Sequence, residues 1–94
     1  NEPGYYREGA FGIRIENLLL IHEAKAIDGG ERPMLGFETL TLCPIERRLI
    51  ETKLLTRDEL HWLDVYHARV LKEIGDHLTG AELSWLQRAC APFN

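Results

Sequence analysis

The sequence has few of the features that mark several classes of protein. Its 94 residues include two cysteines, Cys43 and Cys90, too few for a disulfide framework and typical of buried thiols in a reducing cytoplasm. The longest apolar run, residues 18–21, is far too short to cross a bilayer, so no membrane association is expected. Basic residues form no cluster and the formal net charge is −4, so nucleic acid is not an expected partner.

The chain also lacks the signals of export and of repetition. Its start has no basic segment followed by an apolar one, so it does not read as a signal peptide. It begins with Asn1 rather than Met, as expected of a fragment. No internal repeat or low-complexity tract occurs. The hydrophobic fraction of 45% is ordinary for a folded chain, which makes this one small domain or a piece of one.

The first half of the chain has the alternation of β-strands. Residues 11–22 read as a strand whose isoleucines point one way while Arg14 and Glu16 point the other. Residues 35–42 read as a second strand, and Pro44 ends it. The loop over residues 28–33 contains Asp-Gly and Gly-Gly, so the two strands are expected to pair antiparallel.

The second half has the pattern of helices. Thr56 and Glu59 fit a capping box at the start of a helix over residues 57–78. A second Thr-x-x-Glu box begins at Thr79 and precedes a helix over residues 80–90. The expected apolar stripes are Leu60, Leu63, His67, Val70, Ile74 and Leu78 on the first helix, and Leu83, Leu86 and Cys90 on the second.

These elements predict an α+β fold with antiparallel strands followed by two helices. The β part is expected over residues 1–44 and the helical part over residues 45–94. Trp62 and Trp85 flank the apolar stripes. Packing within the fold is the usual role of such residues, and a Trp in a contiguous exposed apolar patch would instead favour an interface.

Two carboxylates near the start of the chain are candidate metal ligands. Glu2 precedes a Pro-Gly turn signal, and Glu16 shares a strand face with Arg14. By spacing alone, surface charge on an edge strand is the more common explanation for them. Converging carboxylates would suit a hard divalent cation, but two of them are too few ligands without partners from elsewhere.

The same residues carry a family resemblance. Glu-Pro-Gly-Tyr-Tyr at residues 2–6, followed by Gly-Ile-Arg-Ile-Glu-Asn at residues 12–17, resembles the last two metal-binding motifs of the pita-bread metallopeptidases. It is most similar to the Xaa-Pro aminopeptidase (aminopeptidase P) branch of family M24. Leu-Thr-Leu-Cys-Pro-Ile at residues 40–45 and the helix containing Trp62 resemble the C-terminal extension of the larger, cytosolic members. The resemblance covers essentially the whole chain and implies a fragment of the pita-bread fold.

The resemblance implies roles for four residues. The family's site holds two divalent ions, usually manganese in this branch, on two Asp, one His and two Glu. Glu2 and Glu16 match the two Glu, and Glu16 is the ligand expected to bridge both ions. Arg14 matches an arginine that braces the site, and Tyr6 matches an active-site tyrosine position. The remaining ligands lie upstream in the family, and His22, His61, His67 and His77 are expected to be ordinary surface or core-edge residues.

The resemblance also implies a reaction and a partner. The substrates would be peptides with proline at the second position, cleaved before that proline. The larger family members are commonly dimers, so a homodimer formed through the C-terminal region is expected. We expect the isolated 94 residues to bind manganese weakly and to hydrolyse nothing. A structural or dimerisation module, or a catalytically dead homologue used for interaction, are the alternatives.

Overall fold

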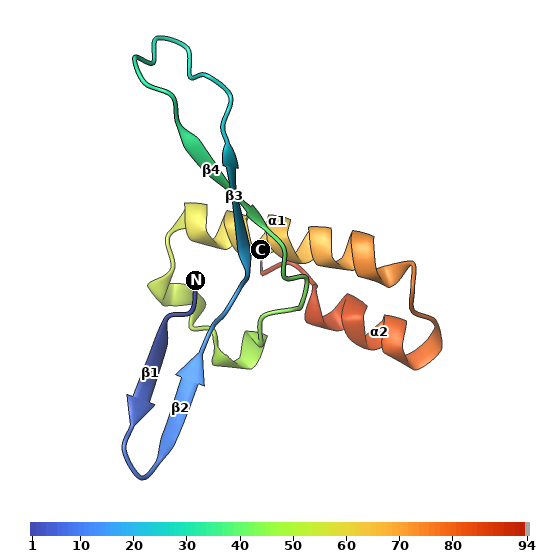
Figure 1. Ribbon diagram of the computed structural model, residues 1–94. Helices are drawn as coiled ribbons and strands as arrows, with labels where there is room; N and C mark the ends of the chain where they lie inside the picture. The colour runs from blue at the N-terminus through green and yellow to red at the C-terminus, as the bar shows by residue number, and fades with distance from the viewer. Residues whose placement is uncertain (94) are drawn as a thin grey trace. The chain divides into compact units, whose positions relative to one another are not determined.

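The chain forms two compact units. Figure 1 shows the computed structural model, which describes residues 1–93. The first unit is Asn1–Thr41 and the second is Leu42–Asn94. The first contains antiparallel strands and the second contains the helices, so the predicted α+β class is confirmed. No helix in the described part of the chain has the length and apolar character needed to span a membrane.

The first unit consists of two antiparallel hairpins. Strand β1 (Gly4–Arg7) pairs with β2 (Phe11–Arg14), and β3 (Leu19–Glu23) pairs with β4 (Leu35–Thr39). Each pair is a two-stranded sheet. The second hairpin confirms the antiparallel pairing predicted across the loop, although β4 ends before residue 42.

The single strand predicted over residues 11–22 is divided in the structure. Its first part, β2, pairs with β1, which the sequence did not predict as a strand, and its second part, β3, pairs with β4. Between them, the Leu18 N–H donates to the Thr41 hydroxyl at 2.8 Å rather than to a neighbouring strand. The change from alternating to continuous apolar residues after Asn17 therefore marks a change of pairing partner.

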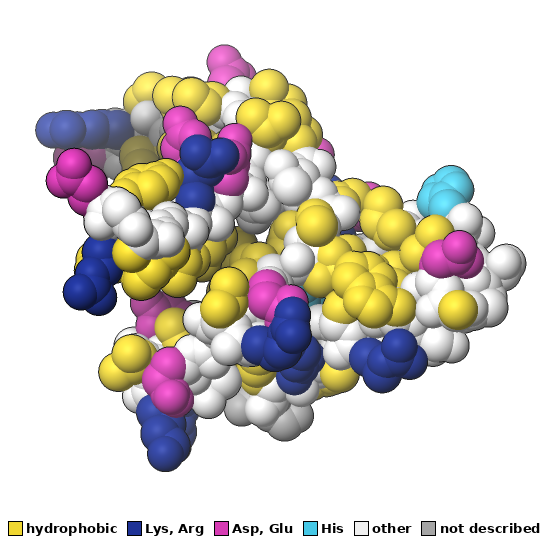
Figure 2. Space-filling model, turned by 90° about the horizontal axis from the view of Figure 1, so that it is seen from below, with side chains coloured by type: hydrophobic (Ala, Val, Ile, Leu, Met, Phe, Trp, Pro, Cys, Tyr) yellow, Lys and Arg dark blue, Asp and Glu magenta, His cyan; other side chains and the backbone are white. Residues whose placement is uncertain are grey.

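The β1–β2 hairpin has one apolar face. Tyr5, Phe11, Ile13 and Ile15 alternate with the polar residues, and the rings of Tyr5 and Phe11 lie 6.0 Å apart. All four side chains are largely exposed in this chain. Figure 2 shows hydrophobic side chains, in yellow, reaching the surface on the face drawn there.

The second unit contains two α-helices preceded by two short 3-10 turns. The turns are η1 (Arg47–Leu49) and η2 (Thr52–Leu54), and the helices are α1 (Arg57–Gly75) and α2 (Gly80–Ala89). Both helices are slightly shorter than predicted. Helix α1 ends early because the N–H groups of residues 77 and 78 donate to carbonyls only three residues back, which tightens the last turn.

The core of the second unit lies between α1 and α2. Its buried residues are Tyr66, Val70, Leu86 and Cys90, with Leu42, Ile45, Leu71, Ile74 and Leu78 packed against them. The predicted apolar stripes are thus the buried faces of the two helices. Tyr66 was not among the predicted core residues, whereas Cys43, predicted to be buried, is exposed.

The two predicted capping boxes have different outcomes. At α1 the Thr56 hydroxyl accepts from the Glu59 N–H at 3.2 Å, and the Glu59 carboxylate accepts from the Thr56 N–H at 2.8 Å. At α2 Thr79 is the N-cap, but its side chain makes no capping hydrogen bond. The capping box predicted at residues 79–82 was therefore wrong. The reason is Gly80, whose φ of +56° takes the first residue of α2 out of helical geometry.

Candidate metal centre

The β1–β2 hairpin places the four predicted site residues on one face. In its register Arg14 lies opposite Gly4, and Tyr6 lies two residues beyond Gly4 along β1. Because side chains alternate between faces with a period of two, Tyr6 and Arg14 point to the same side. Continued by two positions, the same register sets Glu2 opposite Glu16 on that side. We call these two residues the carboxylate pair.

Backbone hydrogen bonds on either side fix the geometry of the carboxylate pair. The Asn17 N–H donates to the Asn1 carbonyl at 3.0 Å, and the Asn1 nitrogen donates back to the Asn17 carbonyl at 3.2 Å. On the other side, the Ile15 N–H donates to the Pro3 carbonyl at 3.1 Å. The carboxylate pair therefore occupies the non-hydrogen-bonded position, where side chains of antiparallel strands approach most closely.

This position brings two like charges together. Directly opposed residues on antiparallel strands have β-carbons about 4.5–5.5 Å apart, and like charges there are destabilising. A cation between the carboxylates would remove that repulsion. Carboxylate oxygens are the donors that hard divalent ions such as manganese and magnesium prefer. The donor set and its placement therefore fit a divalent metal ion.

Arg14 connects the carboxylate pair to the rest of the face. Its Nε lies 3.2 Å from an oxygen of Glu16, and both side chains are about half exposed. The pKa of Arg14 is raised, first by a side-chain hydrogen bond with Tyr6 and then by the charge of Glu16, with a smaller contribution from Glu2. The guanidinium thus lies beside both the Tyr6 phenol and the Glu16 carboxylate.

The four residues lie on one face, as the sequence predicted for Arg14 and Glu16, and the register adds Tyr6 and Glu2 to it. Arg14 is the neighbour of both side chains: interaction with the Tyr6 phenol is the first cause of its raised pKa, and an oxygen of Glu16 lies 3.2 Å from its Nε. The structure therefore joins Tyr6, Arg14 and Glu16 in sequence, with Glu2 beside them.

None of the four histidines belongs to the β1–β2 hairpin. His22 is in β3, where its Nδ1 hydrogen-bonds the Glu23 carbonyl at 2.8 Å, and His61 and His77 are exposed in the helical unit. His67 is fully buried, and its Nε2 accepts from the Ile45 N–H at 3.0 Å. Within the described residues, no group of three or more His, Cys, Asp or Glu gathers that could hold a metal ion.

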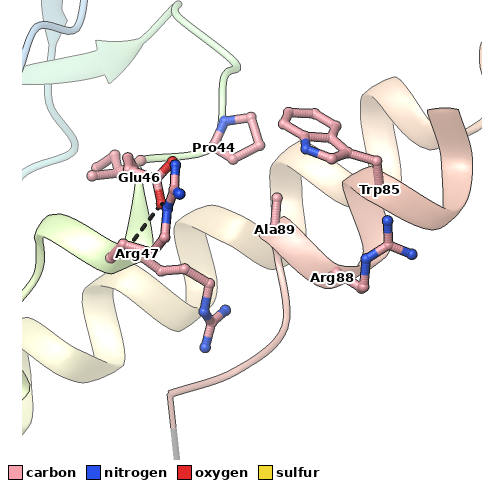
Figure 3. Close-up of a pocket in the computed structure, with 8 residues that line it drawn as sticks. Pro44, Glu46, Arg47, Trp85, Arg88 and Ala89 are labelled. Carbon is pink, nitrogen blue, oxygen red and sulfur yellow. Dashed lines mark hydrogen bonds and ion pairs between the residues drawn. The ribbon is translucent and has the colours of Figure 1, made fainter.

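A second feature of interest is a groove of about 500 Å³ in the helical unit. Pro44 lines it from the segment before η1, and Trp85 and Arg88 line it from α2 (Figure 3). Two further arginines are held within the unit: Arg48 forms an ion pair with Glu46 at 3.0 Å, and Arg47 donates to the Ala91 carbonyl at 2.6 Å. The Arg48 bonds lower the pKa of Glu46 to about 2. Three arginines and a single carboxylate line the groove, so it keeps a net positive charge.

Trp85 also borders an apolar patch on the other side. There it lies with Leu78, Ala81 and Glu82, and the exposed surface is almost entirely apolar. The indole is about half exposed. Trp62 is exposed to a similar extent, but its ring stacks on Tyr66 with centroids 5.3 Å apart. Of the two tryptophans, Trp85 is thus the one that lies in an exposed apolar patch, the condition under which the sequence analysis favours an interface.

The chain is similar to one family of proteins along nearly its full length. Residues 33–93 match the family described as the C-terminal region of peptidase_M24. The chain is 50% identical to the Probable Xaa-Pro aminopeptidase P of Botryotinia fuckeliana, over 99% of its own length and 15% of that protein. It is 46% identical to Aminopeptidase P1 of Lotus japonicus, over 98% of its own length and 14% of that protein.

A solved structure has the same fold. The crystal structure of X-prolyl aminopeptidase from Caenorhabditis elegans, described as a cytosolic enzyme with a di-nuclear active site, matches with a TM-score of 0.85 and 44% identity. The match covers 98% of this chain and 15% of that one, so the predicted fragment of a pita-bread aminopeptidase fold is confirmed. The chain spans about one seventh of the length of the relatives it matches.

Proposed function

Because this chain belongs to the family of C-terminal regions of M24 peptidases, we propose that it is the C-terminal part of an Xaa-Pro aminopeptidase. Residues 1–44 belong to the catalytic domain in this proposal, and residues 45–94 form a helical extension. The observation that carries the proposal is the carboxylate pair, two like charges directly opposed on one face of a hairpin and braced by Arg14. Relatives named Xaa-Pro aminopeptidase P support the reaction class.

The carboxylate pair would supply two ligands of a dinuclear metal site. Glu2 and Glu16 would hold the ions, which we take to be manganese, and Glu16, 3.2 Å from Arg14, is the one that the family resemblance would assign to both. The metals, when bound, would lower the pKa of a coordinated water so that it is a nucleophile at neutral pH. The described residues have narrower tasks. Arg14 would orient Glu16, and Tyr6 places a phenol on the same face as the carboxylates.

The substrates in this proposal are peptides with proline at the second position. Assaying the full-length protein with manganese on a Gly-Pro peptide and on a matched Gly-Ala peptide tests this directly. We expect turnover of the first and little of the second. Equal turnover of both would contradict the proline requirement, and turnover of neither would favour a catalytically dead homologue used for interaction.

The 94 residues alone should be inactive. Divalent ions of this class take about six ligands, and the carboxylate pair provides only part of such a set. We expect the purified chain to bind manganese weakly and to leave Gly-Pro peptides intact. Appreciable hydrolysis by the chain alone would contradict the division of ligands proposed here.

The proposed location is the cytosol, because the similar nematode enzyme is described as cytosolic.

A second proposed role is assembly into a homodimer through α2. Glu82, Trp85 and Arg88 are spaced three residues apart, so they lie in a row along one side of the helix. If two copies of α2 pack antiparallel about Trp85, the Glu82 of one copy faces the partner's Arg88. The apolar patch beside Trp85 supports this arrangement, because a two-fold interface requires a self-complementary surface.

Light scattering of the full-length protein tests the dimer. We expect Trp85→Glu to lower the molar mass from that of a dimer to that of a monomer. Trp62→Ala is the matched control, because Trp62 is equally exposed but stacks within its own unit, and it should leave the mass unchanged. A dimer that persists in Trp85→Glu would show that the interface lies elsewhere.

A further inference from the structure

The ring of Tyr6 lies flat against two glycines. A methyl group built on Gly12, directly opposite Tyr6, would lie 2.7 Å from Cδ1 and 3.1 Å from Cε1 of the ring. One built on Gly4 would lie 2.8 Å from the phenol oxygen and 2.9 Å from Cε2. Carbon atoms do not approach so closely, so any side chain at either position would lift the ring from the hairpin.

The position of the ring decides where the phenol oxygen goes. Gly4 lies opposite Arg14, so an oxygen held above Gly4 is within reach of the guanidinium. Arg14 in turn binds Glu16 at 3.2 Å. Lifting the ring would separate Tyr6 from Arg14 and release one of the contacts that orient Glu16. The outer face of the ring stays open, since Tyr6 is 65% exposed in this chain.

A similar contact elsewhere shows that closeness of a ring to a glycine is not by itself functional. In the other hairpin, a methyl group on Gly36 would lie 2.9 Å from Cε1 of His22, its cross-strand partner. There the ring covers a glycine as general support for a sheet. What distinguishes the Tyr6 contact is its connection through Arg14 to the carboxylate pair.

We propose that Gly4 and Gly12 are positioning residues for the proposed peptidase reaction: their missing side chains let Tyr6 lie on the hairpin face and deliver its phenol oxygen to Arg14 beside Glu16. This rests on the proposed function. In that function Tyr6 would be the residue that faces the substrate, and the two glycines would act through it. Gly4, two residues before Tyr6, and Gly12, across the hairpin from it, thus act together to position the Tyr6 ring.

A double-mutant cycle in the full-length, manganese-loaded protein tests this. We expect Gly12→Ala to lower kcat on a Gly-Pro peptide on the order of 10²-fold, as misplaced catalytic groups do, with KM changed far less. In a Tyr6→Ala background the same substitution should cause no further loss. The melting temperature should follow the same cycle, falling for Gly12→Ala only when Tyr6 is present, and this readout does not depend on activity.

Gly36→Ala is the matched control, because it displaces a ring from a glycine in the other hairpin. It should leave kcat near that of the wild type. The proposal is overturned if Gly12→Ala keeps wild-type kcat, or if it lowers kcat equally with and without Tyr6. A wild-type protein that hydrolyses no Xaa-Pro peptide would instead overturn the proposed function, so the two failures are distinguishable.

Discussion

Two side chains of helix α1 form hydrogen bonds with the backbone of the segment before η1. Tyr66 donates to the Cys43 carbonyl at 2.9 Å and accepts from the Cys43 N–H at 3.3 Å. The next residue of α1, His67, accepts from the Ile45 N–H. For that bond Nε2 must be unprotonated, so the neutral ring carries its proton on Nδ1. His67 is therefore a buried neutral histidine whose protonation would break a contact.

The stability of the helical unit should accordingly depend on pH. Burial and the charge of Arg47 lower the pKa of His67 below 6.5, and Asp64 opposes them only in part. The unfolded chain therefore binds more protons below that value than the folded chain does. The stabilisation is complete above pH 6.5 and is lost as the pH falls toward the folded pKa.

Urea unfolding of the chain at a series of pH values measures this effect. We expect the free energy of unfolding to fall below pH 6.5 in the wild type. His67→Gln keeps an acceptor for the Ile45 N–H but does not titrate, so its profile should be flatter. Identical profiles for the two proteins would show that His67 is not the source of the pH dependence.

At the scale of elements, the two helix starts make a matched pair. Thr56 makes a capping bond and Thr79 does not, although both begin a Thr-x-x-Glu sequence. We expect Thr56→Ala to lower the free energy of unfolding by about 1 kcal/mol, the usual value of a side-chain cap. Thr79→Ala should cost much less in the same urea titration. Equal losses would mean that the Thr79 cap forms in solution.

Gly80 and Gly75 offer a second comparison, in the connection between the helices. Gly80 has a φ of +56° with open space around it, so Gly80→Ala should cost about 1 kcal/mol through backbone strain alone. A methyl group on Gly75 would meet Leu71 and Leu83 at 3.5 and 3.6 Å, an ordinary contact distance. Gly75→Ala should therefore be neutral or slightly stabilising. Thermal melts of the two variants distinguish these outcomes.

The helices were easier to predict than the strands for a physical reason. The apolar spacing of α1 and its cap at Thr56 are local signals, and the structure follows them. The strand over residues 11–22 was divided because its first half pairs with the segment just before it and its second half with residues 35–39, and alternation does not reveal which segment a strand pairs with. The failed cap at Thr79 has a local cause, the glycine that follows it, and that signal was present in the sequence.

The candidate site was predictable in part. Glu2, Tyr6, Arg14 and Glu16 were identified as site residues by family resemblance, whereas spacing alone left the carboxylates as surface charge. Their common face depends on the register of β1 with β2, which no sequence pattern fixed. Gly4 and Gly12 were missed, because their contribution is the space that they leave for a ring, and that space is defined only once the strands pair.

At the scale of the whole molecule, the first unit has the form of a piece of a larger sheet structure. Its two hairpins are separate two-stranded sheets, and hydrophobic side chains such as Phe37 and Ile21 are mostly exposed. Isolated hairpins of this kind are marginally stable in water. The helical unit has its own buried core. We therefore expect hydrogen exchange of the isolated chain to show protection in α1 and α2 and little in the strands; equal protection in both units would contradict this.

The central claim is that Glu2 and Glu16 are metal ligands, and metal content tests it most directly. The measurement is the manganese bound per full-length protomer after dialysis, in the wild type, in Glu16→Gln and in Glu8→Gln, an exposed control from the turn of the same hairpin. The account predicts two ions in the wild type and the control, as in a di-nuclear site, and loss of metal in Glu16→Gln. Undiminished metal in Glu16→Gln would contradict it.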